Sequence, residues 1–162
     1  MSTMDDRAFL RHTLATLAYR AGKTLRGASP ALANAQLTPG AKSPVEILAH
    51  MGDLFDWALS MAIGKPKWNT ATPQAWDAEC ARFFAALRAF DDALASDRPL
   101  ATETTQLFQG PIADALTHTG QIAFIRRLTG EPVKGESYNR ADIRIGSVGP
   151  DQSPPDPRYE FD

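Results

Sequence analysis

The stretch DALTHTGQIAFIRRLTG, residues 114–130, combines helical spacing with two side chains that bind metals well. Its apolar residues recur every three or four positions, which predicts one inward-facing stripe of an α-helix: Ile122, Ile125 and Leu128. Asp114 and His118 are four residues apart on that same face, on adjacent turns. Because an i, i+4 pair can offer two ligands to one ion, we interpret the stretch as part of a metal site.

Three other stretches have the same periodicity, so we predict four helices, over about residues 4–26, 43–63, 72–96 and 111–129. Pro44, Pro73 and Pro111 are each expected in a first turn, where proline is tolerated. Ser43 and Glu46 have the spacing of a capping box. On the third helix the charged residues are expected mostly on the solvent side, among them Glu79, Arg82 and Asp91. The sequence therefore predicts an all-α fold, a four-helix bundle over residues 1–130.

The last 32 residues, 131–162, differ in composition and contain five of the twelve prolines. They also contain enough aromatic and branched residues that we expect an irregular tail packed on the bundle. Within it, ADIRIG at residues 141–146 is the one stretch expected to form a short helix or strand.

Composition narrows the class of partner. Seventeen Lys and Arg stand against nineteen Asp and Glu, so no basic surface for nucleic acid or anionic membranes is expected. No apolar run approaches the roughly 20 residues of a membrane-spanning helix, and the charged N-terminus does not resemble a signal peptide. The single cysteine, Cys80, excludes an internal disulfide and is expected to be a buried, inert thiol. These features favour a cytoplasmic protein with a small-molecule substrate.

His50 is the third candidate ligand. On a helical wheel it lies on the inward side of the second helix, so it can complete a His50–Asp114–His118 set that leaves coordination positions open. Two alternatives stay open for these residues. A histidine on an apolar face is often only a hydrogen-bonded core residue, and Asp114, early in its helix, has the position of a dipole or capping aspartate. His12 points away from the leucine stripe, and a surface or interface role is expected for it.

Two glycines stand close to these histidines. Gly52 follows His50 by two residues and Gly120 follows His118 by two, although a glycine inside a helix costs up to about 1 kcal/mol relative to alanine. They indicate a close approach of helices or room for a ligand. The alternative is that each accommodates a neighbouring aromatic ring.

These residues resemble a known family. PVEILAHMGDLFDWAL on the second helix, followed by HTGQI on the fourth, is similar to the DinB/YfiT-like superfamily of bacterial four-helix-bundle proteins. That family has one histidine on its second helix and an H-x-x-x-H pair on its last. His50 matches the first ligand and His118 the last, while Asp114 stands at the middle position. The resemblance covers roughly residues 5–130. The aspartate either replaces a histidine as a ligand or marks a lineage that has lost its metal.

The resemblance implies a function. Relatives include metal-dependent transferases and isomerases that use a low-molecular-weight thiol such as mycothiol or bacillithiol. It implies a divalent metal, with zinc, nickel, iron and manganese not separable, and a thiol cosubstrate, or else a metal-bound water that hydrolyses a substrate. It also implies a homodimer. The alternative is a non-catalytic, stress-associated bundle that binds a ligand or dimerises, in which the three polar residues form a structural network.

Overall fold

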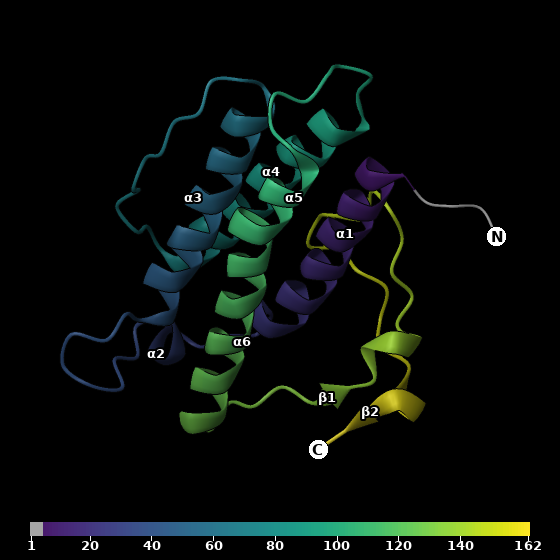
Figure 1. Ribbon diagram of the computed structural model, residues 1–162. Coiled ribbons are helices and arrows are strands. Elements are labelled where there is room, and N and C mark those ends of the chain that lie inside the picture. Colours follow the sequence, from purple (N-terminus) through teal and green to yellow (C-terminus); the bar gives the residue numbers. More distant parts are fainter. Residues whose placement is uncertain (1–4) are drawn as a thin grey trace.

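The computed structural model describes residues 5–162 and shows an all-α protein (Figure 1). The predicted start of the first helix at Met4 lies outside the described residues. Four long helices dominate: α1 (Asp6–Leu25), α3 (Pro44–Ala62), α4 (Trp76–Ala95) and α6 (Ala113–Leu128). The smaller elements are α2 (Pro30–Ala33), α5 (Thr104–Leu107), the π-helical turn η1 (Phe108–Ile112), the 3-10 turns η2 (Tyr138–Arg140) and η3 (Pro157–Tyr159), and the strands β1 (Gly135–Glu136) and β2 (Glu160–Phe161).

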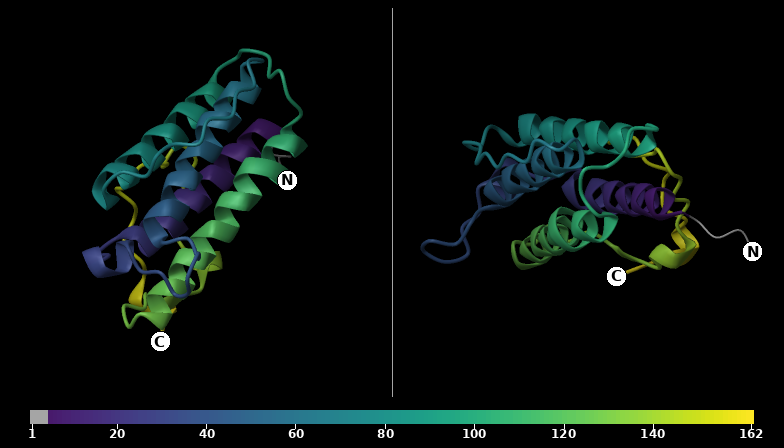
Figure 2. Two further views of the ribbon diagram at one scale, coloured as in Figure 1. Left: turned by 90° about the vertical axis from the view of Figure 1, so that its left-hand side faces the viewer. Right: turned by 45° about the horizontal axis from the view of Figure 1, so that its top comes forward.

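The four long helices contact one another in a closed ring. α1 packs against α4 and α6, and α3 packs against the same two helices (Figure 2). The core between them contains leucines from every long helix except α6, which contributes isoleucines, and three fully buried phenylalanines, Phe55, Phe83 and Phe90. The ring of Phe55 lies 5.9 Å from that of Phe83 and 6.2 Å from that of Phe90. Burying one such side chain stabilises the fold by roughly 1.5–3 kcal/mol, so this cluster fixes how α3 packs on α4.

The start of α3 is as the sequence predicts. Pro44 occupies the first turn, and Ser43 and Glu46 form the capping box. The Ser43 N–H donates to the Glu46 carboxylate at 2.7 Å, and this bond holds the pKa of Glu46 below its usual value.

The start of α4 differs from the prediction. The helix begins at Trp76 and not at residue 72 or 73, and Pro73 lies in the extended segment before it. The reason is visible in the backbone amides of that segment. The Ala71 N–H donates to Asp53 at 3.1 Å and the Gln74 N–H donates to Glu79 at 2.8 Å, which holds residues 71–74 in an extended form.

The solvent side predicted for α4 is also wrong in part. Glu79 is fully buried and Asp91 is 1 % exposed. Each has a cationic partner that offsets the cost of burial: Arg82 for Glu79, and Arg11 of α1, whose guanidinium donates twice to Asp91 at 2.9 and 3.0 Å. Paired charges can lie in the interior, and a helical wheel does not reveal the pairing.

The largest correction concerns Pro111, which is not in a first turn. The helical run begins at Thr104, passes through the π-helical turn η1 with Pro111 inside it, and continues into α6. Proline lacks the N–H of the regular ladder and collides with the carbonyl four residues before it, and a wider turn relieves that collision. Because the run is continuous, Asp114 does not stand at a free helix N-terminus: the Ala113 N–H is already directed to the carbonyls of Phe108 and Gly110.

The tail packs on α1 (Figure 1). Its two short strands pair antiparallel, with Gly135 opposite Phe161 and Glu136 opposite Glu160. Tyr19 of α1 donates its hydroxyl to Glu136 at 2.6 Å, and Lys23 forms ion pairs with Glu136 and Glu160, both at 2.8 Å. Burial, together with this bond, raises the pKa of Tyr19.

The side of α1 near Tyr19 is covered by this tail: Tyr19 is 2 % exposed, and His12 is half-buried. One further expectation fails. ADIRIG, residues 141–146, forms neither a helix nor a strand. Among the described helices, none has a stretch both long and apolar enough to cross a bilayer.

Candidate metal centre

His50, Asp114 and His118 lie together between α3 and α6. His50 Nε2 is 3.4 Å from one carboxylate oxygen of Asp114, and His118 Nε2 is 3.4 Å from the other. The two imidazole rings are 4.9 Å apart and almost perpendicular. One ligand atom from each residue lies within 4.8 Å of the other two, so the three side chains that the sequence singled out could hold a single ion.

The chemistry of the donor set fits a divalent metal. Hydrogen bonds between a charged carboxylate and an imidazole are typically about 2.7–2.9 Å long. Both contacts of Asp114 with the histidines are longer, at 3.4 Å, and they involve different carboxylate oxygens. The donor set, two imidazoles and one carboxylate, is also a common one for divalent transition metals.

The group is reachable from solvent. The side chains of His50 and His118 are 27 % and 19 % exposed, and that of Asp114 is 46 % exposed. Below it, Ile122 and Ile125 are buried as predicted, whereas Leu128, assigned to the same stripe, is 56 % exposed at the end of α6. A half-exposed group on an apolar base can accept a further ligand from outside the protein.

Gln121 orients His118. Its Oε1 lies 2.7 Å from His118 Nδ1, so it can accept the Nδ1–H of the imidazole. With Nδ1 bonded in this way, Nε2, which lies 3.4 Å from Asp114 Oδ1, is the ring nitrogen left to bind a metal. Fixing the second ring nitrogen in this way is how proteins commonly prepare a histidine for a metal. The HTGQ spacing places Gln121 one turn beyond His118, so this contact is encoded locally.

Aromatic rings cover His50 on one side. Trp68, in the segment between α3 and α4, has its ring centre 5.5 Å from that of His50 and 5.7 Å from that of Trp57. Its indole N–H donates to Thr70 at 3.0 Å. No periodic pattern in the sequence marks this residue, because it lies outside any helix.

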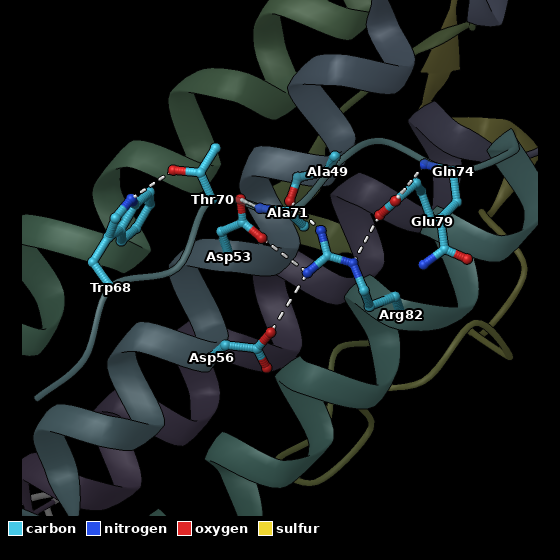
Figure 3. A network of polar contacts seen from close by, with 9 residues as sticks. All are labelled: Ala49, Asp53, Asp56, Trp68, Thr70, Ala71, Gln74, Glu79 and Arg82. Carbon is cyan, nitrogen blue, oxygen red and sulfur yellow. Dashed lines mark hydrogen bonds and ion pairs between the residues drawn. The ribbon is translucent and has the colours of Figure 1, made fainter. Parts of the chain in front are cut away.

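The segment that carries Trp68 is anchored by a half-buried arginine, Arg82 (Figure 3). Arg82 of α4 donates to Glu79 at 2.8 Å, to Asp53 at 3.0 Å, and to the Ala49 carbonyl. The same two carboxylates accept the amides of Ala71 and Gln74, at the far end of the segment from Trp68. The position of the indole over His50 therefore depends on a network on the other side of α3.

The glycines beside the histidines have different explanations. A Cβ at Gly52 would lie 2.8–2.9 Å from the Arg82 guanidinium, so this glycine makes room for the arginine and not for a ligand or an aromatic ring. A Cβ at Gly120 would meet nothing within 4 Å. Gly120 is exposed, and packing gives no reason for it.

Two pockets flank the metal group. The first, which we name the Lys42 pocket, has a volume of about 420 Å³ and is lined by Lys42, Ile47, His50, His118, Gln121, Phe124 and Ile125. The second, the Asp114 pocket, has a volume of about 370 Å³ and is lined by Leu54, Trp57, Gln109, Gly110, Ala113, Asp114 and Thr117. The histidines face one pocket and the carboxylate faces the other.

A larger cavity, about 910 Å³, lies elsewhere, between α1, α4 and the tail. Its charged lining residues are of both signs, Arg26 and Arg88 with Asp77 and Asp151, so it selects no ligand charge. Cys80, which lines it, is half-buried, and burial raises the pKa of this thiol to about 12. Such a thiol is almost wholly protonated near neutral pH and therefore a poor nucleophile, in line with the inert role expected from the sequence.

Comparisons of the chain with models of protein families, with curated proteins and with solved structures find no match.

Proposed function

We propose that this protein binds a divalent metal through His50 Nε2, His118 Nε2 and the Asp114 carboxylate, as its resemblance to the DinB/YfiT-like superfamily implies. The observation that carries the proposal is the convergence of these three ligand atoms within 4.8 Å, with Gln121 Oε1 2.7 Å from the other ring nitrogen of His118. Zinc, nickel, iron and manganese all fit such a donor set. Asp114 contributes the only negative charge, so a divalent ion held there keeps a net positive charge.

The reaction that this arrangement supports best is transfer of a low-molecular-weight thiol to a small electrophile. A metal in the site supplies Lewis acidity, which lowers the pKa of a thiol so that it reacts as thiolate. The chain's own residues leave the nucleophile to a cosubstrate. The two flanking pockets contain no cysteine or serine, and the hydroxyl of Thr117 already donates to the Ala113 carbonyl at 3.0 Å.

The partially exposed position also favours an enzyme or a ligand-binding site over a purely structural triad. A structural network would close its hydrogen bonds, whereas Asp114 is nearly half exposed and its histidine contacts are 3.4 Å long. Two pockets, one on each side of the group, give room for two small molecules. A homodimer, which the resemblance also implies, stays a prediction.

The test is the visible spectrum of the protein loaded with cobalt(II), before and after addition of 2-mercaptoethanol. A thiolate bound to cobalt gives an intense charge-transfer band, and we expect this band in the wild type and its loss in His118→Ala. A cobalt-loaded wild type whose spectrum is unchanged by the thiol would contradict thiol chemistry while leaving metal binding intact.

A further inference from the structure

The Lys42 pocket joins apolar walls to a single cationic group. Ile47 of α3 is buried, and Phe124 of α6, 54 % exposed, supplies a second wall. Both histidines of the metal group also line the pocket. A ligand here would have an apolar body in contact with these walls and one end at the imidazoles.

Lys42 is the only Lys, Arg, Asp or Glu among the residues that line this pocket. It is exposed and, within residues 5–162, has no carboxylate within ion-pairing distance. Glu46, whose pKa is lowered by Ser43 and also by Lys42, accepts from the Ser43 N–H and hydroxyl at 2.7 and 2.8 Å and does not line the pocket. The ammonium group is therefore free to pair with an anion.

We propose that the Lys42 pocket is the substrate subsite of the metal centre, and that it selects a small amphipathic anion. The apolar body lies against Ile47 and Phe124, the anionic head pairs with Lys42, and the opposite end reaches the histidines. Lys42 is then a specificity-determining residue that touches no metal. This inference rests on the proposed function for its catalytic meaning, although binding in the pocket can be measured without the metal.

The Asp114 pocket fits the same anion less well. It presents the negatively charged carboxylate and has no cationic side chain among its lining residues. In the metal-free protein an anion that approached from this side would be repelled, so charge favours the Lys42 side for the anion.

The experiment measures binding of hexanoate, and of its neutral isostere hexanamide, to metal-free protein by calorimetry. We expect hexanoate to bind more tightly than hexanamide, and Lys42→Gln to remove most of that preference. An exposed pair contributes little, so the expected loss is about twofold to fivefold in hexanoate affinity. Lys65→Gln, an exposed lysine outside the pocket, is the matched control and should change nothing.

Two further arms separate the apolar contribution from the charge. Phe124→Ala should weaken hexanoate and hexanamide by the same factor, because the ring contacts only the apolar body. In the wild type, affinity should rise by up to about fourfold for each CH₂ added from butyrate to hexanoate, since each buried CH₂ contributes a similar free energy. The comparison of acid with amide in the wild type needs no variant and so holds even if a variant folds poorly.

Equal affinity for hexanoate and hexanamide in the wild type, or equal losses in Lys42→Gln and Lys65→Gln, would overturn the proposal. The metal content of the same samples distinguishes a failure of the proposed subsite from a failure of the proposed metal centre. Metal-binding protein without the anion preference refutes the subsite alone. Protein that shows the preference but takes up no metal keeps the subsite and refutes the metal centre.

Discussion

Helix α3 has a polar cluster on each of two sides, and the two clusters differ in how completely they are paired. On one side Asp53 and Arg82 belong to a network in which Glu79 is fully buried and Asp53 is 4 % exposed. On the other side His50 belongs to a group whose side chains are 19–46 % exposed and whose contacts are 3.4 Å long. The first cluster supplies its own cation. The second has side chains that could bind a cation and contains no Lys or Arg, and this contrast is our reason for proposing a binding site there.

The largest loss of stability is expected from Arg82→Met. It leaves Glu79 and Asp53 buried without their cation, and breaking a buried pair in this way costs about 3–5 kcal/mol. The free energy of unfolding from urea denaturation measures the loss. Arg144→Met is the matched control, because the Arg144–Asp142 pair is exposed and should contribute less than about 1 kcal/mol. Similar losses in both variants would refute the structural role of the Arg82 network.

The second expected effect is a loss of metal affinity when Gln121 is replaced. Gln121→Met removes the acceptor for the His118 Nδ1–H while keeping a side chain of similar length. Loss of such an orienting partner lowers metal affinity by roughly 10–100-fold. Competition with a chromophoric chelator gives the dissociation constant. An unchanged constant, with the variant as stable as the wild type, would show that Gln121 does not prepare the histidine.

Replacing each of the two helical glycines with alanine should change the stability of the protein in opposite directions, by smaller amounts. Gly120→Ala places its methyl group in open space and should stabilise the protein by up to about 1 kcal/mol. Gly52→Ala pushes against the Arg82 guanidinium, whose hydrogen bonds hold it in place, and should destabilise by about 1–3 kcal/mol. Thermal unfolding of both variants measures the two signs. A stabilising Gly52→Ala would mean that the arginine moves aside at little cost.

The smallest change in stability is expected for Asp114, when the protein holds no metal. Asp114→Asn changes a side chain that is 46 % exposed, so the free energy of unfolding should change by no more than about 0.5 kcal/mol. Chemical denaturation in the presence of EDTA measures it. A loss of several kcal/mol would instead place Asp114 in a structural network like that of Arg82.

The sequence predicts one of these clusters and misses the other. His50, Asp114 and His118 could be found because helical periodicity places them on inward faces, and the i, i+4 spacing of Asp114 and His118 survives in the structure. The Arg82 network could not be found from the sequence. Its acids come from two helices, and a charged residue on a helical wheel is assigned to solvent by default. The glycine at position 52 was a signal for it, but glycine marks close approach without naming the neighbour.

The same limit explains the helix boundaries. The start of α3 is encoded locally by Ser43, Pro44 and Glu46 and was predicted correctly. The start of α4 is set by Asp53 and Glu79, which bind the amides of the preceding segment from a distance. The π-helical turn at Pro111 depends on the helical run continuing from Thr104, which a proline in the sequence argues against. Local chemistry is readable from sequence, and tertiary contacts that override it are not.

Metal content is the most direct measurement of the central claim. Untagged wild-type protein, loaded with zinc and dialysed, should retain one ion per chain by mass spectrometry, and His50→Ala and His118→Ala should each lose it while keeping the helical circular dichroism of the wild type. Wild-type protein that retains no zinc, nickel, iron or manganese, or histidine variants that retain as much as the wild type, would contradict the account.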